Sequence, residues 1–514
     1  MRRLALLLAL AIPLALAACD AGRSDTALDA GGPATAGAAT VRCANRNNDT
    51  EAKLLECVTL AGVQRHLAAF QAIADANGGT RADGTPGYEA SVDYVVRTLA
   101  AAGYDARRVP FSYQVPDEAD LQQVAPVAAT YATGGFSGSG DGDVTAAVVA
   151  VDINLTPPRA NTSGCQAADF AGFPAVAVAL IQRSGVCTFR TKASNAQAAG
   201  ASAAVIFNQG NTPAREGLIV SSLGSPALGI PVVGASFADG AALAQPGSVA
   251  RVRVQNATVT SWNVVAETRG GASGRVVILG GHLDSVVGGP GIQDNGSGSA
   301  ALLETAVMMG KVELANRVRF AWWGAEERGL IGSTAYVADL SPAELDAVAA
   351  YLNFDMIGSP NYVRFVADGD GSDTGNPGPA GSGAIEAFLG GFYTARGLAF
   401  EPFWLDNRSD YAPFALAGIP VGGLFTGAEG IKTAAQAAVY GGTAGVALDP
   451  CYHQACDTDA NVNPVVLDLN ADALAASALH FGMAADGPRG PRRPAAPRAR
   501  AAHDHAHDHG ALAE

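Results

Sequence analysis

The sequence has few positive charges and few histidines. Its 33 Lys and Arg stand against 48 Asp and Glu, which gives a formal net charge of −15. A field of that sign repels phosphate backbones, so we expect no nucleic-acid partner. The 514 residues include 8 histidines, and between His66 and His480 only His282 and His453 occur. A metal site in that region would therefore have almost no choice of imidazole ligand.

Long apolar runs are missing except at the N-terminus, in "MRRLALLLALAIPLALAACD". That run is short for a membrane span and, after two arginines, is typical of an export signal. Its end resembles a bacterial lipoprotein signal, which implies a lipid on Cys19; an ordinary secretory signal cut nearby is the alternative. We therefore expect a signal peptide over residues 1–18. The protein would be either a cell-envelope lipoprotein, periplasmic or at the surface, or a secreted protein.

Cysteine is also scarce, with 7 in the chain. Without Cys19 an even number remains, and export would place these thiols in an oxidising compartment. We favour local pairing because each couple lies within one predicted module. The expected disulfides are Cys43–Cys57, Cys165–Cys187 and Cys451–Cys456.

Composition and periodicity divide the chain into segments. A helical pattern runs from about 51 to 115, with Gly103 as a stop signal. Short Val/Ala/Ile strands between Gly/Ser/Pro turns then suggest an inserted module, after which strands and helices alternate as in a mainly parallel α/β domain. The predicted segments are a flexible tether (19–50), the α/β domain in two parts (51–119 and 258–485), the inserted module (120–257) and a disordered Pro/Arg- and His-rich tail (486–514).

Metal-ligand side chains follow three apolar strands of the α/β domain. "RVVILGGHLDS" ends in His282 and Asp284, "VRFAWWGAEERG" in Glu326 and Glu327, and "VAAYLNFDMIG" reaches Asp355. Parallel α/β sheets bind ligands at the carboxyl ends of their strands. We therefore expect these residues to meet at one edge of the sheet.

A fourth stretch, "GGPGIQDNGSG", places Asp294 among glycines that let the backbone pack close to a ligand. A carboxylate there could bridge two cations, and His453 completes a set of two His, two Asp and one Glu. Shared by two metals, this set leaves positions open for water, as a catalytic site requires. Each residue alone also has a structural explanation: a satisfied histidine, a solvated Glu pair or a capping Asp. Their joint occurrence in this order favours a metal site.

The stretches "GGHLDS", "GIQDNGSG", "GAEERGLIGS", "LNFDMIGS" and "DPCYHQACD" resemble the exported di-zinc aminopeptidases of the bacterial leucyl aminopeptidase type, metallopeptidase clan MH. The resemblance covers most of residues 50–485. The middle segment, with "DFAGFPAVAVALIQRSGVCTF", resembles a protease-associated domain. The implied fold is an α/β, mainly parallel-sheet sandwich, the zinc exopeptidase fold, with an inserted β-rich α/β protease-associated domain.

The resemblance implies a role for each ligand. His282 and Asp355 would hold one zinc ion, Glu327 and His453 would hold the other, and Asp294 would bridge the two.

Further roles follow from the same resemblance. Glu326 would be the general base. It would take a proton from metal-bound water, which leaves a metal-bridging hydroxide, and pass that proton to the leaving amine. Asp284 would orient His282. Tyr452 would stabilise the oxyanion and Arg408 would contact the substrate; alternatively, Tyr452 only packs and Arg408 only pairs with Asp406 or Asp410.

The expected function is zinc-dependent removal of N-terminal residues from peptides by a monomer. A carboxypeptidase or dipeptidase of the same fold, a non-catalytic surface binding protein and a glutaminyl cyclase relative are the alternatives. Phe425 and Trp404 are candidates for an apolar substrate pocket. The inserted domain would either gate access or only stabilise the protein. The tail "HDHAHDHG" would either capture zinc or have no role.

"DPCYHQACD" also allows a Cys/His zinc site. Thiols that close together would oxidise in an exported protein, so we expect Cys451–Cys456 to close a small loop. Such a loop would hold His453 toward the metals and Tyr452 toward the substrate.

Overall fold

The computed structural model describes Cys43 and residues 45–224, 227–484 and 488. The predicted signal peptide, Cys19, most of the tether and nearly all of the His-rich tail lie outside these residues, and so do the predictions made for them. Within the described ranges, no helix combines the length and apolar character that crossing a membrane requires.

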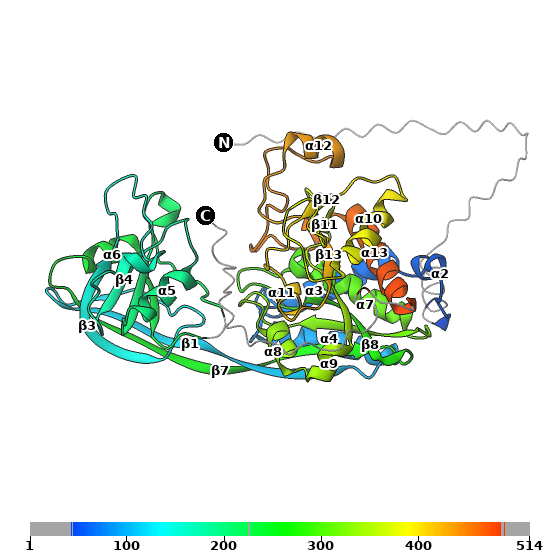
Figure 1. Cartoon of the computed structure of the whole chain (residues 1–514), viewed down its shortest axis with the longest axis horizontal. Coiled ribbons are helices and arrows are strands. Elements are labelled where there is room, and N and C mark those ends of the chain that lie inside the picture. The colour runs from blue at the N-terminus through cyan, green and yellow to red at the C-terminus, as the bar shows by residue number, and fades with distance from the viewer. Residues whose placement is uncertain (1–42, 44, 225–226, 485–487, 489–514) are drawn as a thin grey trace, which may run out of the picture. The chain divides into compact units, whose positions relative to one another are not determined.

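The described strands form one continuous 13-stranded sheet, and its first seven strands in spatial order, which we call the main sheet, have a mostly parallel centre (Figure 1). Strands β13, β10, β8 and β9 run parallel to their neighbours in that group, whereas β11 and β7 are antiparallel to β13 and β9. Their order is β12 (Glu401–Phe403), β11 (Phe365–Ala367), β13 (Val421–Phe425), β10 (Val348–Phe354), β8 (Ala272–His282), β9 (Asn316–Trp323) and β7 (Val249–Glu267).

Helices cover both faces of this sheet. Along β8, Val277 and Leu279 belong to one core, and Val276 and Ile278 belong to the other. Successive strand residues point to opposite faces, so both faces are buried and the strands are nearly all apolar. The first core is filled by side chains of six helices: α2 (Glu51–Leu55), α3 (Leu60–Ala76), α4 (Pro86–Ala101), α7 (Ser297–Met309), α10 (Ser382–Thr394) and α13 (Pro464–Met483). Three helices contribute to the second core or pack on it: α8 (Ile331–Asp339), α9 (Pro342–Ala347) and α11 (Tyr411–Leu416). Helix α12 (Ala434–Tyr440) contributes Tyr440 to a small separate cluster.

The helical pattern predicted to about residue 115 ends earlier. Helix α4 begins after the N-cap Thr85 with Pro86 in its first turn and ends at Ala101, and Gly103 follows with a φ of 90°. Strand β1 then occupies Arg107–Ala125. The prediction was wrong for residues 107–115, because a pairing partner far along the chain fixes them as a strand.

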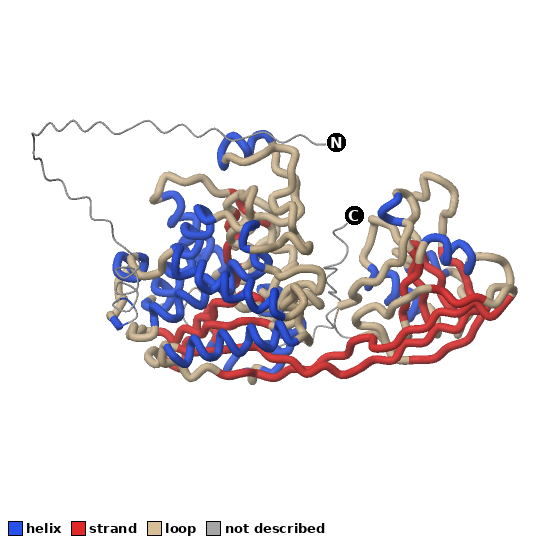
Figure 2. The backbone as a smooth tube through the Cα atoms, turned by 180° about the vertical axis from the view of Figure 1, so that it is seen from behind, coloured by secondary structure: helices blue, strands red, loops and turns tan. Residues whose placement is uncertain are grey.

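That partner is β7, and the two strands lie side by side over 19 residues each (Figures 1 and 2). Their antiparallel register runs from Arg107 opposite Val265 to Ala125 opposite Val249. At one end β7 also pairs with β9, and at the other it pairs with β3 (Gly142–Val151). The ribbon therefore continues across the proposed boundaries near 120 and 257.

The inserted module contains a second parallel group of strands. Strand β3 pairs in parallel with β4 (Val178–Gln182), followed by β5 (Ala203–Phe207) and β6 (Val232–Ala235). Helices α5 (Phe189–Ala198) and α6 (Phe237–Leu243) contribute to two apolar cores, and β2 (Ala129–Tyr131) pairs with β1.

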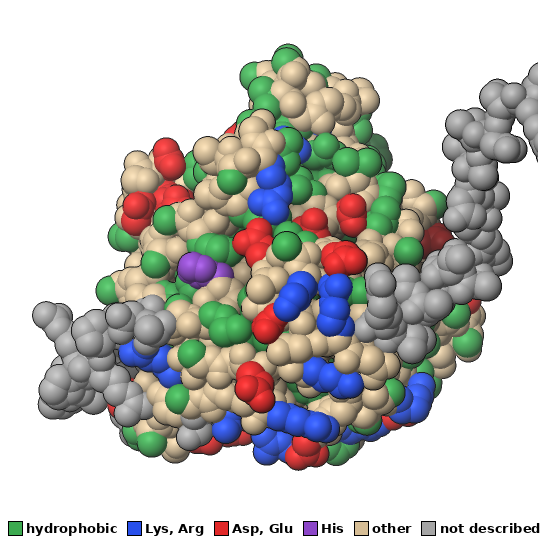
Figure 3. Space-filling view, turned by 90° about the vertical axis from the view of Figure 1, so that its right-hand side faces the viewer, with side chains coloured by type: hydrophobic (Ala, Val, Ile, Leu, Met, Phe, Trp, Pro, Cys, Tyr) green, Lys and Arg blue, Asp and Glu red, His purple; other side chains and the backbone are tan. Residues whose placement is uncertain are grey.

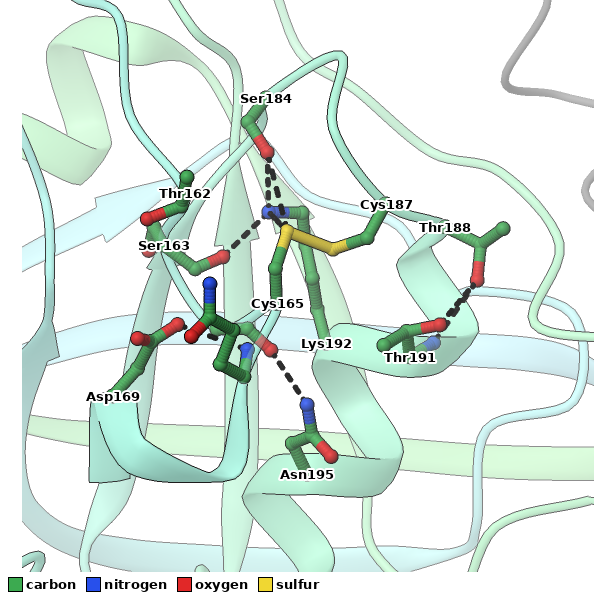
Figure 4. The surroundings of a disulfide bond; sticks show 12 residues. Thr162, Ser163, Cys165, Asp169, Ser184, Cys187, Thr188, Thr191, Lys192 and Asn195 are labelled. Atoms are coloured by element: carbon green, nitrogen blue, oxygen red, sulfur yellow. Dashed lines mark hydrogen bonds between the residues drawn. A yellow bond between two sulfur atoms is a disulfide. The ribbon is translucent and has the colours of Figure 1, made fainter. Parts of the chain in front are cut away.

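A buried lysine lies beside a disulfide of this module (Figure 4). Lys192 of α5 is fully buried, and its Nζ donates to the carbonyl oxygens of Ser163 and Gln182 and to Ser184 Oγ at 2.8 Å. Cys165 Sγ lies 3.6 Å from the same ammonium. The charge is thus surrounded by acceptors, as buried charges require.

The structure contains disulfides between Cys43 and Cys57, between Cys165 and Cys187, and between Cys451 and Cys456. These are the local pairs expected from the sequence. The face drawn in Figure 3 carries acidic and basic side chains with apolar ones scattered among them.

Candidate active site

Three neighbouring parallel strands end at one edge of the main sheet. His282 is the last residue of β8 and lies opposite Trp323, the last residue of β9. Glu326 and Glu327 follow β9 closely, and Asp355 directly follows β10. Parallel strands bring their carboxyl ends to the same edge. The structure therefore brings these side chains together.

Asp294 lies between two imidazoles. It belongs to the short segment η3 (Ile292–Gly296) that leads into α7, and its Oδ1 is 3.1 Å from His282 Nε2 while its Oδ2 is 3.2 Å from His453 Nε2. His282 Nε2 also lies 3.3 Å from Asp355 Oδ1, and His453 Nε2 lies 3.0 Å from Glu327 Oε2. The first half-site is thus His282 and Asp355, the second is His453 and Glu327, and Asp294 is shared.

Two carboxylate oxygens of the half-sites lack hydrogen-bond partners. Glu327 Oε1 and Asp355 Oδ1 are both buried and accept no hydrogen bond, although Asp355 Oδ1 lies 3.3 Å from His282 Nε2; Asp355 Oδ2 accepts a hydrogen bond from Ser409 Oγ at 2.6 Å. A buried polar atom without a partner is costly unless a ligand satisfies it. Imidazole nitrogens and carboxylate oxygens are the ligands of catalytic zinc. The residues of both half-sites therefore fit metal ions.

Burial and charge shift the pKa values at this edge. Burial lowers the pKa of His453, but the negative charges of Glu327 and Asp294 outweigh this effect and raise the pKa of His453 to about 11. Burial raises the pKa of Glu326 well above its usual range, against the opposing influence of His282. The carboxylates thus draw positive charge, as a proton or a metal cation, toward the imidazoles.

Asp284 contacts more than the histidine it was expected to orient. His282 Nδ1 lies 3.0 Å from the backbone oxygen of Asp284 and 3.6 Å from its carboxylate Oδ1. The Asp284 carboxylate accepts hydrogen bonds from the backbone nitrogens of Glu326 at 3.2 Å and Glu327 at 3.3 Å. One side chain thus ties the end of β8 to the loop after β9.

Two residues that hold the backbone around Asp294 were not identified from the sequence. The Asp457 carboxylate accepts hydrogen bonds from the backbone nitrogens of Gln293 at 2.9 Å and Asp294 at 3.1 Å. The fully buried Arg81 donates to the carbonyl oxygens of Leu283, Pro290 and Gly291. Asp457 directly follows Cys456 in the "DPCYHQACD" stretch, which was the available signal. Arg81 had no local signal, because its acceptors lie about 200 residues away.

Tyr452 and Arg408 lie together at the site. Arg408 Nη2 lies 3.4 Å from the Tyr452 hydroxyl, and the Tyr452 ring stacks on His453 with centroids 3.8 Å apart. Arg408 forms its ion pair with Glu429 at 3.1 Å, and not with Asp406 or Asp410 as the structural alternative proposed. Glu429 thus holds Arg408 next to the tyrosine.

A cavity opens in front of the half-sites. Besides the ligands, Glu326, Arg408 and Tyr452, its lining includes the apolar side chains of Met356, Phe403, Leu424 and Phe425. Phe425 was expected there. The prediction for Trp404 was wrong: its side chain is not part of the lining and is 57% exposed. Strand β12 ends at Phe403, whose side chain lines the cavity, and Trp404 follows outside the strand.

Comparisons with known proteins give the family. A family model described as Peptidase family M28 matches residues 263–478, and one described as PA domain matches residues 144–243. An aminopeptidase of Pseudomonas aeruginosa is 50% identical over 433 residues, covering 82% of this chain and 81% of the relative. The chain belongs to peptidase family M28.

Other similar proteins agree with this assignment. The probable lipoprotein aminopeptidase LpqL of Mycobacterium tuberculosis is 39% identical to this M28 peptidase over 443 residues, covering 84% and 87% of the two chains. The structure of an aminopeptidase from Aneurinibacillus sp. strain AM-1 matches with a TM-score of 0.60 at 27% identity, covering 83% of this chain and 95% of that one. These findings confirm the predicted family, the α/β fold class, the inserted PA domain and the aminopeptidase function.

Proposed function

We propose that this M28 peptidase is a di-zinc aminopeptidase that releases N-terminal residues from peptides. The observation that carries the proposal is the position of Asp294, whose two oxygens face one imidazole each. A carboxylate so placed is suited to two cations a few ångströms apart.

The two half-sites would each hold one zinc ion. His282 and Asp355 would be ligands of the first ion, His453 and Glu327 would be ligands of the second, and Asp294 would contribute one oxygen to each. Zinc supplies a Lewis acid that polarises the scissile carbonyl and brings the pKa of water near neutrality.

Glu326 is the proposed general base. Its side chain is 3% exposed and its Oε2 lies 4.0 Å from His282 Nε2, so it borders the first half-site. A carboxylate with a raised pKa can take a proton from the attacking water and then give it to the leaving amine. Asp284 would position this base through its hydrogen bonds to the backbone nitrogens of Glu326 and Glu327.

Tyr452 and Arg408 are proposed to act at the scissile carbonyl of the substrate, Tyr452 directly and Arg408 through Tyr452. The Tyr452 hydroxyl would donate a hydrogen bond to the oxyanion that forms at the scissile carbonyl. Arg408, held by Glu429, lies beside that hydroxyl and would fix its position.

The charge of the cavity favours an amino end over a carboxyl end. Asp294, Glu326, Glu327 and Asp355 all line it, and Arg408 is the only Arg or Lys among the described residues of the lining. That arginine is already paired with a glutamate. A terminal carboxylate would therefore meet no unpaired Arg or Lys among the described residues of the lining, while Phe403, Leu424 and Phe425 offer apolar contact to the first side chain of the peptide.

The test compares free and N-acetylated peptides with wild type and Glu326→Gln. The wild type should cleave only free peptides, and Glu326→Gln should lose about 10²–10⁴-fold in kcat while keeping its zinc. Cleavage of the acetylated peptide would point to a carboxypeptidase, and a fully active Glu326→Gln would overturn the role of the base.

The location and partners are proposed from coarser findings. The disulfides and the similarity to a lipoprotein aminopeptidase are consistent with an exported protein. We propose a lipid anchor on Cys19, a monomeric state and peptides as the substrate.

A further inference from the structure

Three carboxylates gather in a second place, on the loop between β11 and α10. Asp368 and Asp370 begin this loop, and Glu386 lies in α10. One oxygen from each of the three lies within 4.8 Å of the others. Carboxylates this close repel one another unless a proton or a cation lies between them.

One carboxylate oxygen of Asp368 has no hydrogen-bond partner. Its side chain is fully buried, and its Oδ2 accepts hydrogen bonds from the backbone nitrogens of Asp373 at 3.2 Å and Thr374 at 2.6 Å. Its Oδ1 is buried and has no hydrogen-bond partner. The loop thus folds around one half of this carboxylate, and the other half is available to a ligand.

The charges of the cluster also favour a cation. Burial raises the pKa of Asp368, but the hydrogen bonds that its carboxylate accepts from Thr374 and Asp373 outweigh that effect, so its pKa lies below the usual value. Burial raises the pKa of Glu386, with further upward influence from Asp370 and Asp368 against hydrogen bonds from the backbone nitrogens of Asp370 and Gly369. An ionised Asp368 thus keeps negative charge beside two further acids.

The geometry points to a calcium-type divalent cation site formed by Asp368, Asp370 and Glu386. All three ligands are carboxylates, and no imidazole or thiolate belongs to the cluster. Such hard oxygen ligands select calcium or magnesium over zinc, and calcium accepts irregular geometry and more ligands than magnesium does. The site shares no residue with the zinc half-sites.

This loop is connected to the wall of the substrate cavity. The backbone nitrogen of Asp368 donates to the carbonyl oxygen of Phe403 at 3.0 Å, and Ala367 lies opposite Phe403 in the β11–β12 pair. Phe403 lines the cavity. A cation at the loop would therefore stabilise this wall, so calcium should lower KM more than it changes kcat.

The test uses the full-length protein with saturating zinc, dialysed free of calcium and then titrated with calcium chloride. The variants are Asp370→Asn and Glu386→Gln, and the matched control is Asp373→Asn, an exposed acid of the same loop outside the cluster. Wild type and control should bind one calcium ion by calorimetry. Their Tm should rise by about 3 °C at calcium 100-fold above Kd. Both cluster variants should lose the bound ion and the rise in Tm while keeping their zinc content.

Two outcomes would overturn the proposal. One is a wild type whose Tm and heat signal do not respond to calcium. The other is an equal loss of binding in Asp373→Asn, which would show diffuse attraction to an acidic loop. Neither depends on peptide hydrolysis, so the zinc mechanism is tested separately.

Discussion

The main sheet and the inserted PA module both place buried charges at the carboxyl ends of parallel strands, but only one of them satisfies those charges. Lys192 of α5 reaches the end of β4 and donates to three oxygen acceptors, from Ser163, Gln182 and Ser184. After the ends of β9 and β10, Glu327 and Asp355 each keep a buried oxygen that accepts no hydrogen bond. Satisfied charges stabilise a fold, whereas unsatisfied ones mark places prepared for a ligand.

The largest loss of activity is expected for Asp294→Asn, which alters the carboxylate shared by the two half-sites. The amide keeps the shape but supplies one neutral oxygen where two charged ones faced the imidazoles, so one half-site loses its shared ligand and the other keeps only a weaker, uncharged one. We expect activity on an aminoacyl nitroanilide to fall by at least about 10³-fold, because several kcal/mol of charge stabilisation are lost. Steady-state kinetics with parallel zinc analysis measures this.

The matched control is Asp346→Asn, an exposed acid on α9. It should keep wild-type kinetics. An Asp294→Asn enzyme that retained full activity and zinc would show that no carboxylate bridge is needed.

The two loop disulfides should separate function from stability. Cys451–Cys456 closes a ring of sequence separation 5 around His453, and Cys165–Cys187 spans 22 residues in the PA module. Replacing the first pair by serine should weaken zinc binding about 10–100-fold with little change in Tm, since the loop positions a ligand. Replacing the second should lower the free energy of unfolding by about 3 kcal/mol and leave kcat unchanged.

Competition with a zinc chelator and thermal unfolding of both double variants give these quantities. The comparison fails if the Cys451/Cys456 variant binds zinc like wild type while its fold collapses.

The smallest effect on catalysis is expected for Lys192→Met. Methionine leaves three acceptors of the PA module without their charged donor, which should destabilise the protein by about 3 kcal/mol in denaturant unfolding. The kcat/KM for a small aminoacyl substrate should stay within about 2-fold of wild type. A large loss of activity with intact zinc content would show that the PA module contributes to catalysis and would contradict its assignment as a purely structural module.

Sequence reasoning located the site because parallel topology gathers strand ends. His282, Glu327 and Asp355 are spread over about 70 residues of the chain, yet His282 ends one apolar strand, Glu327 comes shortly after a second and Asp355 directly follows a third. The scarcity of histidine then left only His453 as the second imidazole. These were local signals combined with one general rule of sheet geometry.

The remaining features depend on contacts between distant segments. Residues 107–115 form a strand only because β7, more than a hundred residues later, pairs with them. Arg81 is buried because the carbonyl groups of the loop after β8 surround its guanidinium. Phe403 lines the cavity and Trp404 does not because the three-residue edge strand β12 ends at Phe403, and no pattern in the sequence indicates where that strand ends.

The most direct test of the central claim is the number of zinc ions bound per chain in the purified, zinc-equilibrated protein, measured by mass spectrometry of the metal. The shared position of Asp294 predicts two ions in the wild type and fewer in Asp294→Asn. A fully active wild type with a single zinc ion would contradict it.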